Sequence, residues 1–234
     1  METVQLGRTG LTVSRVCLGA GGTSRLGRKQ GRSDADIIAL VRTALDLGVT
    51  LFDTAPNYGT EDILGAALQG RRDAIVLSSK VRCTRDGKPF ESTDYCSPAD
   101  IRRSVERSLA LLRTDRLDIL HFHGVRPHQY AYCVEELLPE LKALRDEGKI
   151  RFFGLTESFG NDRDHAVAEQ AVRDGHFDVL MLGFNMVNPS LARTVLPLAK
   201  AAGVGTMCMY AVRGALARKD AARPLVETLV AAGE

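Results

Sequence analysis

The chain has 234 residues, of which 44% are hydrophobic and 26% charged. This ordinary globular composition excludes disordered, collagen-like and fibrous proteins. The formal charge of +2 and the lack of a long apolar run argue against a nucleic-acid partner, a membrane partner and a secretory signal, so we expect a cytoplasmic protein.

The first residues predict a β-hairpin that precedes the repeating part of the fold. Short alternating runs at Val4–Leu6 and Leu11–Ser14 flank the turn Gly7-Arg8-Thr9-Gly10. Two such runs around a glycine-rich turn are typical of a hairpin.

After the hairpin, short apolar runs rich in β-forming residues alternate with amphipathic segments of helical period. This alternation is typical of βα units repeated around a parallel sheet. The expected strands are Arg15–Leu18, Leu51–Asp53, Ile75–Ser79, Leu117–Phe122, Arg151–Leu155, Val179–Phe184 and Gly205–Met209. The expected helices are Asp34–Leu47, Glu61–Gln69, Pro98–Leu112, Val134–Glu147, Asp162–Asp174, Leu191–Ala201 and Arg223–Ala232.

This pattern predicts an α/β fold in a single domain over residues 1–234. Without a reversal of strand order, a (β/α)8 TIM barrel fits better than an open doubly wound sheet. The sequence stops at Glu234 before another apolar run, so we expect a barrel that lacks its eighth strand and the C-terminal helices. Open strand edges would then favour self-association.

Polar residues at strand ends are the candidates for chemistry, because the active site of a parallel barrel lies there. Asp53, Lys80 and His123 stand at or just beyond the ends of expected strands, and Tyr58 lies in a following loop. An ammonium that a carboxylate holds in place lowers the pKa of a neighbouring phenol, which can then exchange a proton. A neutral imidazole can hydrogen-bond a carbonyl oxygen. Taken singly, each side chain can equally be a structural strand end.

The run His121-Phe122-His123 contains two imidazoles. We expect them to face opposite ways, with one packed against the helix layer, which argues against a two-histidine metal site. The five cysteines are odd in number, lie far apart and form no CxxC, so neither a disulfide framework nor a zinc site is expected.

Several segments together resemble the aldo-keto reductase family over nearly the whole chain. They are Leu6–Ser14, similar to its barrel-closing hairpin, Leu51–Gly59, similar to its Asp and Tyr signature, and Gly148–Thr156, similar to the approach to its fifth strand. Lys80 takes the position of the family lysine. Asp118 lies five residues before His123, which is the family spacing to the catalytic histidine and selects His123 over His121.

The resemblance implies hydride transfer between NADP(H) or NAD(H) and an aldehyde, a ketone or a sugar. Tyr58 would exchange the proton, Asp53 and Lys80 would tune it, and His123 would orient the carbonyl. By position, the family's cofactor contacts fall on Gly21, Gly22, Thr156, Met181, Asn185 and Met209. The strand that carries the histidines also resembles the sugar-dehydrogenase branch, including L-galactose dehydrogenases, which points to an aldose or lactol substrate.

Some positions depart from the family pattern. Glu157 stands where an Asn usually binds the nicotinamide carboxamide, Met181 where a Gln is common, and Met209 where an aromatic residue often stacks. Asn185 partly compensates. Arg213 and Arg218 could contact cofactor phosphates or be solvated charges, which leaves NAD and NADP undistinguished. The alternative function is therefore a truncated, weak or inactive family member that acts as a cofactor-sensing or interaction module.

Overall fold

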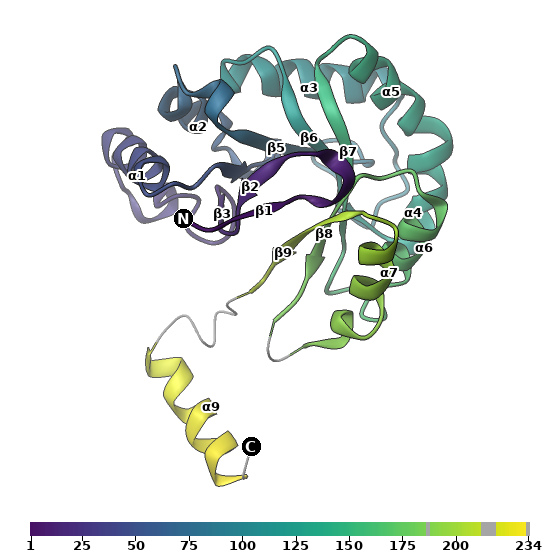
Figure 1. Cartoon of the computed structure of the whole chain (residues 1–234). Coiled ribbons are helices and arrows are strands. Elements are labelled where there is room, and N and C mark those ends of the chain that lie inside the picture. The colour runs from purple at the N-terminus through teal and green to yellow at the C-terminus, as the bar shows by residue number, and fades with distance from the viewer. Residues whose placement is uncertain (186–187, 212–218, 233–234) are drawn as a thin grey trace.

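A parallel sheet is the centre of the computed structural model, which describes residues 1–185, 188–211 and 219–232. Seven strands follow one another in the order β3-β4-β5-β6-β7-β8-β9, and the sheet curls with helices on its outer face (Figure 1). The strands are β3 Cys17–Gly19, β4 Leu51–Asp53, β5 Val76–Val81, β6 Leu117–Val125, β7 Ile150–Glu157, β8 Val179–Gly183 and β9 Gly205–Met209. The predicted α/β class and TIM-barrel type are confirmed, with β3 and β9 as the edge strands.

The predicted hairpin is also present. Strands β1, Thr3–Gln5, and β2, Thr12–Ser14, pair in antiparallel register. Leu6, Leu11 and Val13 pack into the interior of the curled sheet. The turn approaches the start of β9 so closely that a Cβ on Gly7, whose φ is +54°, would lie 2.3 Å from the Gly205 nitrogen. The hairpin therefore fills the amino-terminal end of the sheet and leaves the carboxyl end to the site.

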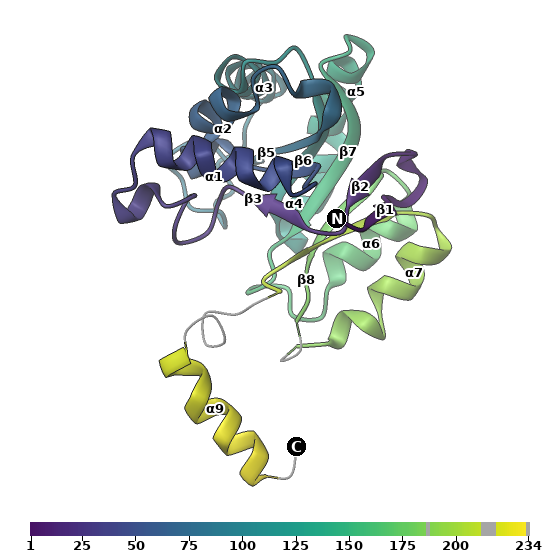
Figure 2. The same ribbon diagram turned by 60° about the vertical axis from the view of Figure 1, so that its left-hand side comes forward.

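Helices cover the outer face of the sheet. They are α1 Asp34–Asp46, α2 Glu61–Leu68, α3 Pro98–Leu112, α4 Pro127–Tyr132, α5 Leu138–Asp146, α6 Ala166–Asp174 and α7 Val195–Ala201, while α9 Lys219–Ala231 lies apart from this layer in both views (Figures 1 and 2). A π-helical turn at Cys133–Leu137 joins α4 to α5. The helix expected to begin at Val134 therefore begins earlier, at Pro127, because proline suits the first helical position.

Helix α3 illustrates how local sequence sets an element. The Ser97 hydroxyl accepts a hydrogen bond from the Asp100 backbone N–H at 3.3 Å, and the Asp100 carboxylate accepts one from the Ser97 N–H at 2.8 Å. This reciprocal cap satisfies two backbone donors at the helix start. It confirms the predicted start of the helix, with Pro98 at the first helical position.

Both faces of the sheet are buried, and each face has a distinct cluster. The outer cluster, against the helices, includes Phe52, Leu120 and Phe122. The inner cluster includes Leu51, Val76, Ile119, Val179 and Met207. In the described ranges no helix is long and apolar enough to cross a membrane.

Candidate active site

Three neighbouring strands direct polar side chains to the carboxyl end of the sheet interior. Asp53 is the last residue of β4, Lys80 stands near the end of β5, and the register places Lys80 beside His121 of β6. Parallel strands carry neighbours in register on the same face. Asp53 and Lys80, two members of the tetrad predicted from the sequence (Asp53, Tyr58, Lys80 and His123), therefore meet at one place.

Lys80 and Asp53 form a buried ion pair, with 2.5 Å between Nζ and a carboxylate oxygen and side chains 1% and 9% exposed. Nζ also donates to the Thr54 carbonyl at 2.8 Å, and the Ser78 hydroxyl donates to the second oxygen of Asp53 at 2.9 Å. Burial works to lower the pKa of Lys80, but attraction to Asp53 outweighs it and raises that pKa above its ordinary value. The ammonium is therefore charged at physiological pH.

Tyr58 lies above this pair, on the turn Pro56–Tyr58 after β4, with its ring centroid 4.9 Å from the Lys80 nitrogen. Burial raises the pKa of Tyr58, and Lys80 opposes this without reversing it, in part because Asp53 acts in the other direction. The expectation of a lowered phenol pKa is thus wrong for the chain alone. The phenol stays protonated, which is the form that can donate a proton.

The expected arrangement of the two histidines is wrong. Side chains two residues apart in a strand point to the same face. His121 and His123 both lie inside the sheet, and Phe122 between them packs outward, 6.2 Å from Phe177 between ring centroids. Burial, followed by the Lys80 charge, lowers the pKa of His121 to about 3 and the pKa of His123 well below its ordinary value. Both imidazoles are therefore neutral.

The two histidines differ in what they contact. His121 is fully buried, and a Cβ on Gly154 would lie 2.2 Å from its Nδ1. The ring of His123 stands edge-on to the rings of Tyr58 and Phe90, at centroid distances of 5.7 and 5.1 Å. His123 is therefore the imidazole beside the phenol. Among the described residues, no group of three or more His, Cys, Asp or Glu side chains could hold a metal ion.

The predicted cofactor residues lie around the same end of the sheet. Gly21 touches the tetrad directly, since a Cβ there would lie 2.6 Å from the Tyr58 ring, whereas nothing lies within 4 Å of one on Gly22. Thr156 of β7 pairs with Met181 of β8, and its hydroxyl accepts from the Gly124 N–H at 2.6 Å.

The other two predicted cofactor residues, Met209 and Asn185, lie further toward the rim. Met209 is the last residue of β9, paired with Gly183. Asn185 is buried and accepts from the Asn188 N–H at 3.0 Å. Arg213 and Arg218 lie outside the described residues.

A second buried polar group, centred on Glu157, His165 and Ser190, was not predicted. One Glu157 oxygen lies 2.8 Å from Nδ1 of His165, whose Nε2 lies 2.8 Å from the Ser190 hydroxyl. The other Glu157 oxygen accepts from the Gly183 N–H at 2.6 Å. The departure of Glu157 from the family pattern was the only signal of this group in the sequence. The structure shows that its carboxylate is engaged internally.

Aromatic rings were also missed at the rim. Tyr210, directly after Met209, stacks on Phe159 with 5.6 Å between ring centroids and is 54% exposed. Its φ is +59°, a left-handed conformation that is uncommon for a tyrosine. This conformation turns the chain at the end of β9 and places an aromatic surface one residue beyond the expected position.

These residues fit a nicotinamide group in part. The open space at Gly22 and the flat surface of Tyr210 and Phe159 suit a planar ring beside Tyr58. Glu157 suits a carboxamide poorly, because a carboxylate has no N–H donor for the carboxamide oxygen and each of its oxygens already has a partner inside the protein.

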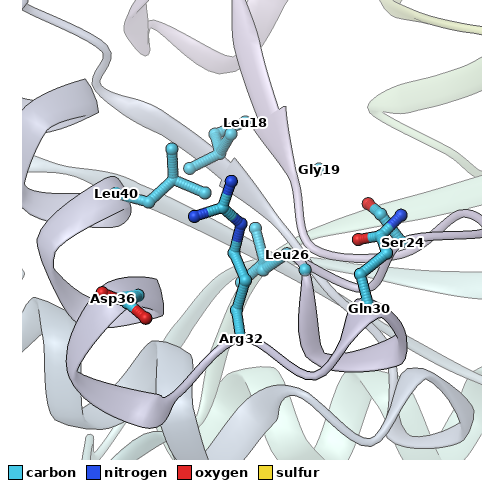
Figure 3. A pocket seen from close by; sticks show the side chains of 9 residues that line it. Leu18, Gly19, Ser24, Leu26, Gln30, Arg32, Asp36 and Leu40 are labelled. Atoms are coloured by element: carbon cyan, nitrogen blue, oxygen red, sulfur yellow. The ribbon is translucent and has the colours of Figure 1, made fainter.

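Two pockets open near this end. One, of about 440 Å³, is lined by Lys80 and His123 together with residues of the following loop and of α3. The other, of about 390 Å³, lies between β3 and α1, where Arg32 points between Leu18 and Leu40 (Figure 3). Lys80 and His123 of the tetrad line the first pocket and no tetrad residue lines the second, so the first is the candidate substrate pocket.

Comparisons with known proteins agree on one family. The sequence matches the Aldo/keto reductase family over residues 16–226. It is 36% identical over 213 residues to L-galactose dehydrogenase of Arabidopsis thaliana, covering 88% of this chain and 64% of that protein. It is 28% identical over 212 residues to D-threo-aldose 1-dehydrogenase of Pseudomonas sp, covering 80% and 62%. The chain thus spans less than two thirds of these curated relatives.

Solved structures show the same likeness. A Pseudomonas aeruginosa protein assigned to the aldo-keto reductases superposes with a TM-score of 0.70 at 33% identity, covering 88% of this chain and 76% of that one. The holo form of an aldo-keto reductase from Bacillus halodurans has a TM-score of 0.71 at 24% identity, covering 89% and 65%. This last likeness concerns the fold alone.

Proposed function

The chain belongs to the aldo/keto reductase family, and we propose that it is an NAD(P)-dependent oxidoreductase that interconverts a carbonyl group and an alcohol. Its substrate would be an aldose or a related carbonyl compound, since two of its relatives are named for sugar oxidation. The observation that carries the proposal is the buried Lys80–Asp53 pair, 2.5 Å apart, with Tyr58 above it and His123 beside it.

In this proposal each side chain has a distinct task. Tyr58 donates its proton to the carbonyl oxygen during reduction and takes one from the alcohol during oxidation. Lys80, kept charged by Asp53, stabilises the negative charge that the phenol oxygen acquires when the proton leaves. His123, which is neutral, donates a hydrogen bond that holds the carbonyl oxygen near Tyr58.

A bound nicotinamide cofactor supplies or accepts the hydride. The residues proposed to hold it are Gly21, Gly22, Thr156, Met181, Asn185 and Met209, with Tyr210 added for its exposed ring. Gly21 has a second task, because its lack of a side chain lets the Tyr58 ring pack against the backbone.

A second candidate is a weakly active or inactive family member that senses the cofactor. The engaged carboxylate of Glu157 favours it, because the residue at the position that the resemblance assigns to the carboxamide already has partners inside the protein. Under this alternative the chain binds NAD(P)H without turning over a carbonyl.

Nicotinamide fluorescence of NADPH and NADH, titrated with the 234-residue chain, tests both candidates when combined with cofactor oxidation over a panel of aldoses and aldehydes. Saturable binding with turnover is expected. Tyr58→Phe should lower kcat by about 10²- to 10⁴-fold, the usual contribution of a general acid. Tyr95→Phe, a tyrosine outside the tetrad, should change it less than twofold. Full activity in Tyr58→Phe would rule out the proposed proton donor, and binding without turnover would favour the sensor.

A further inference from the structure

Among the described residues, the Arg82 guanidinium in the candidate substrate pocket has no acidic partner. Arg82 follows the end of β5, two residues after Lys80, so it continues the same face of the strand. It donates through Nη2 to the Thr84 hydroxyl at 2.8 Å and to the Lys88 carbonyl, while its buried Nε has no hydrogen-bond partner. Within the described ranges no carboxylate lies within ion-pair distance of it. A buried charged donor without a partner is costly unless a ligand satisfies it.

Ring contacts connect Arg82 to the tetrad. Its guanidinium carbon lies 4.1 Å from the Phe90 centroid, and Phe90 packs edge-on against His123 at 5.1 Å. His123 in turn contacts Tyr58 at 5.7 Å. Stacking on an aromatic face orients a guanidinium while its edge donors stay available. Arg82 is therefore held in place beside the residues proposed to bind the carbonyl.

Two cations of the pocket lining remain without an ion pair in the described part of the chain. Among the charged lining residues Lys80 pairs with Asp53, Arg85 with Asp94 and Arg103 with Asp100. The lining cations that form no ion pair in the described part of the chain are Arg82 and Arg107. The remaining lining acids are Asp86, which is exposed, and Glu61, which accepts a hydrogen bond from the Ser79 hydroxyl at 2.9 Å.

We propose that this pocket binds an anionic group of the substrate, and that Arg82 is the residue that selects it. The substrate is then a sugar or short aldehyde that carries a carboxylate or a phosphate, with its carbonyl at Tyr58 and His123 and its anionic group at Arg82. This inference rests on the proposed function for the carbonyl. A planar guanidinium fork with free donors matches the oxygen geometry of either anion.

Calorimetric titration with D-glucuronate, D-glucose 6-phosphate and D-glucose at one fixed ionic strength tests the inference without cofactor or turnover. At least one anionic sugar is expected to bind about 10- to 100-fold more tightly than D-glucose, the usual range for a charge-assisted hydrogen bond. Preference for the glucuronate identifies a carboxylate and preference for the phosphate ester identifies a phosphate. Equal affinity for all three sugars, or no binding of any, would overturn the inference.

Three variants separate charge from fold. Arg82→Gln should abolish the preference, Arg82→Lys should keep part of it, and Arg71→Gln, an exposed arginine outside the pocket, should keep all of it. If Arg82→Gln does not fold, the preference for anionic sugars is compared between Arg82→Lys and the unsubstituted chain, and a reduced preference in Arg82→Lys supports the assignment. An unchanged preference in both Arg82 variants would contradict the assignment.

Turnover distinguishes this failure from failure of the proposed function. With an active chain, Arg82→Gln should lower the ratio of anionic to neutral kcat/KM by the same 10- to 100-fold. A chain that reduces D-glucose and the anionic sugars equally would sustain the proposed function and overturn the role of Arg82. A chain that binds anions through Arg82 but turns over no sugar would support the role of Arg82 and overturn the proposed function.

Discussion

The two halves of the carboxyl end bury charge for different purposes. On the β4–β6 side, the Lys80–Asp53 pair lies beneath the Tyr58 phenol, and Lys80 and His123 line a pocket. On the β7–β8 side, Glu157 is bonded to His165 and to the Gly183 N–H, and the Ser190 hydroxyl continues to the Asn188 side chain at 2.7 Å. The β4–β6 side therefore leaves polar groups for a ligand, whereas Glu157, His165 and Ser190 on the β7–β8 side hydrogen-bond within the protein.

This difference shows that a buried ionisable pair does not by itself mark a catalytic site. Structural ion pairs and active-site pairs are both dehydrated and both perturb pKa values. Here the Lys80–Asp53 pair and the Glu157–His165 pair differ in the polar group that lies next to them. Beside Lys80 it is Tyr58, whereas beyond His165 it is a hydroxyl that already donates to another side chain.

The largest effect should come from removing one member of the buried pair. Lys80→Met leaves Asp53 charged without its cation, so the free energy of unfolding should fall by about 3 to 5 kcal/mol and turnover should be lost. Urea denaturation measures the first effect. The double variant Asp53→Asn/Lys80→Met should recover most of the stability and none of the activity. If the double variant is as unstable as the single one, the loss comes from packing and not from charge.

A smaller effect is expected from Gly21→Ala. The new Cβ would stand 2.6 Å from the Tyr58 ring, which must shift, and displacement of a reacting group by about 1 Å can cost up to 10²-fold. We expect kcat to fall about 10- to 100-fold. Gly19→Ala is the matched control, because nothing lies within 4 Å of a Cβ there. Equal activity in both variants would show that the Tyr58 position is not critical.

The smallest effect should come from Glu157→Gln, on the β7–β8 side of the site. Burial raises the pKa of Glu157, and His165 and the Gly183 N–H oppose this without reversing it. The folded state therefore binds the proton more tightly than the unfolded state, and this contribution to stability is lost as pH rises through the raised pKa. The free energy of unfolding of the unsubstituted chain, relative to Glu157→Gln, should decline as pH rises above about 4.5, the ordinary glutamate pKa.

Equilibrium denaturation at several pH values measures this difference, and we expect it to stay within about 1 to 3 kcal/mol. Activity relative to the parent should change far less than in Lys80→Met. A difference that grows with rising pH would mean that the carboxylate form of Glu157 is stabilised in the fold. A loss of turnover as large as in Lys80→Met would place Glu157 in the chemistry and erase the contrast between the two halves.

Local sequence was sufficient for most elements. Strand β9 and helix α3 have the bounds predicted for them, because their patterns and caps depend only on nearby residues. The start of α4 at Pro127 and the start of α6 at Ala166 were missed. Helix α6 begins late because the Asp162 carboxylate accepts from the Ala166 and Val167 N–H groups, so Asp162 caps the helix from a position before it.

The candidate site shows the same division. Asp53, Tyr58, Lys80 and His123 could be selected from the sequence because strand ends in a parallel barrel converge at one edge. The period of two residues in a strand also places His121 and His123 on the same face, although we expected them on opposite faces. The direction of the Tyr58 pKa could not be predicted, because it depends on how burial balances the charges of Lys80 and Asp53.

The sequence by itself determined the fold class, the order of the strands and the identity of the four residues proposed to act together. Tertiary structure alone decided that Glu157 is engaged by His165, that Gly21 supports Tyr58, and that Arg82 has no acidic partner among the described residues. Pattern and propensity are local properties of the chain. Solvation, ion pairing and ring contacts join residues that are distant in sequence, so their balance exists only once the sheet has brought these residues together.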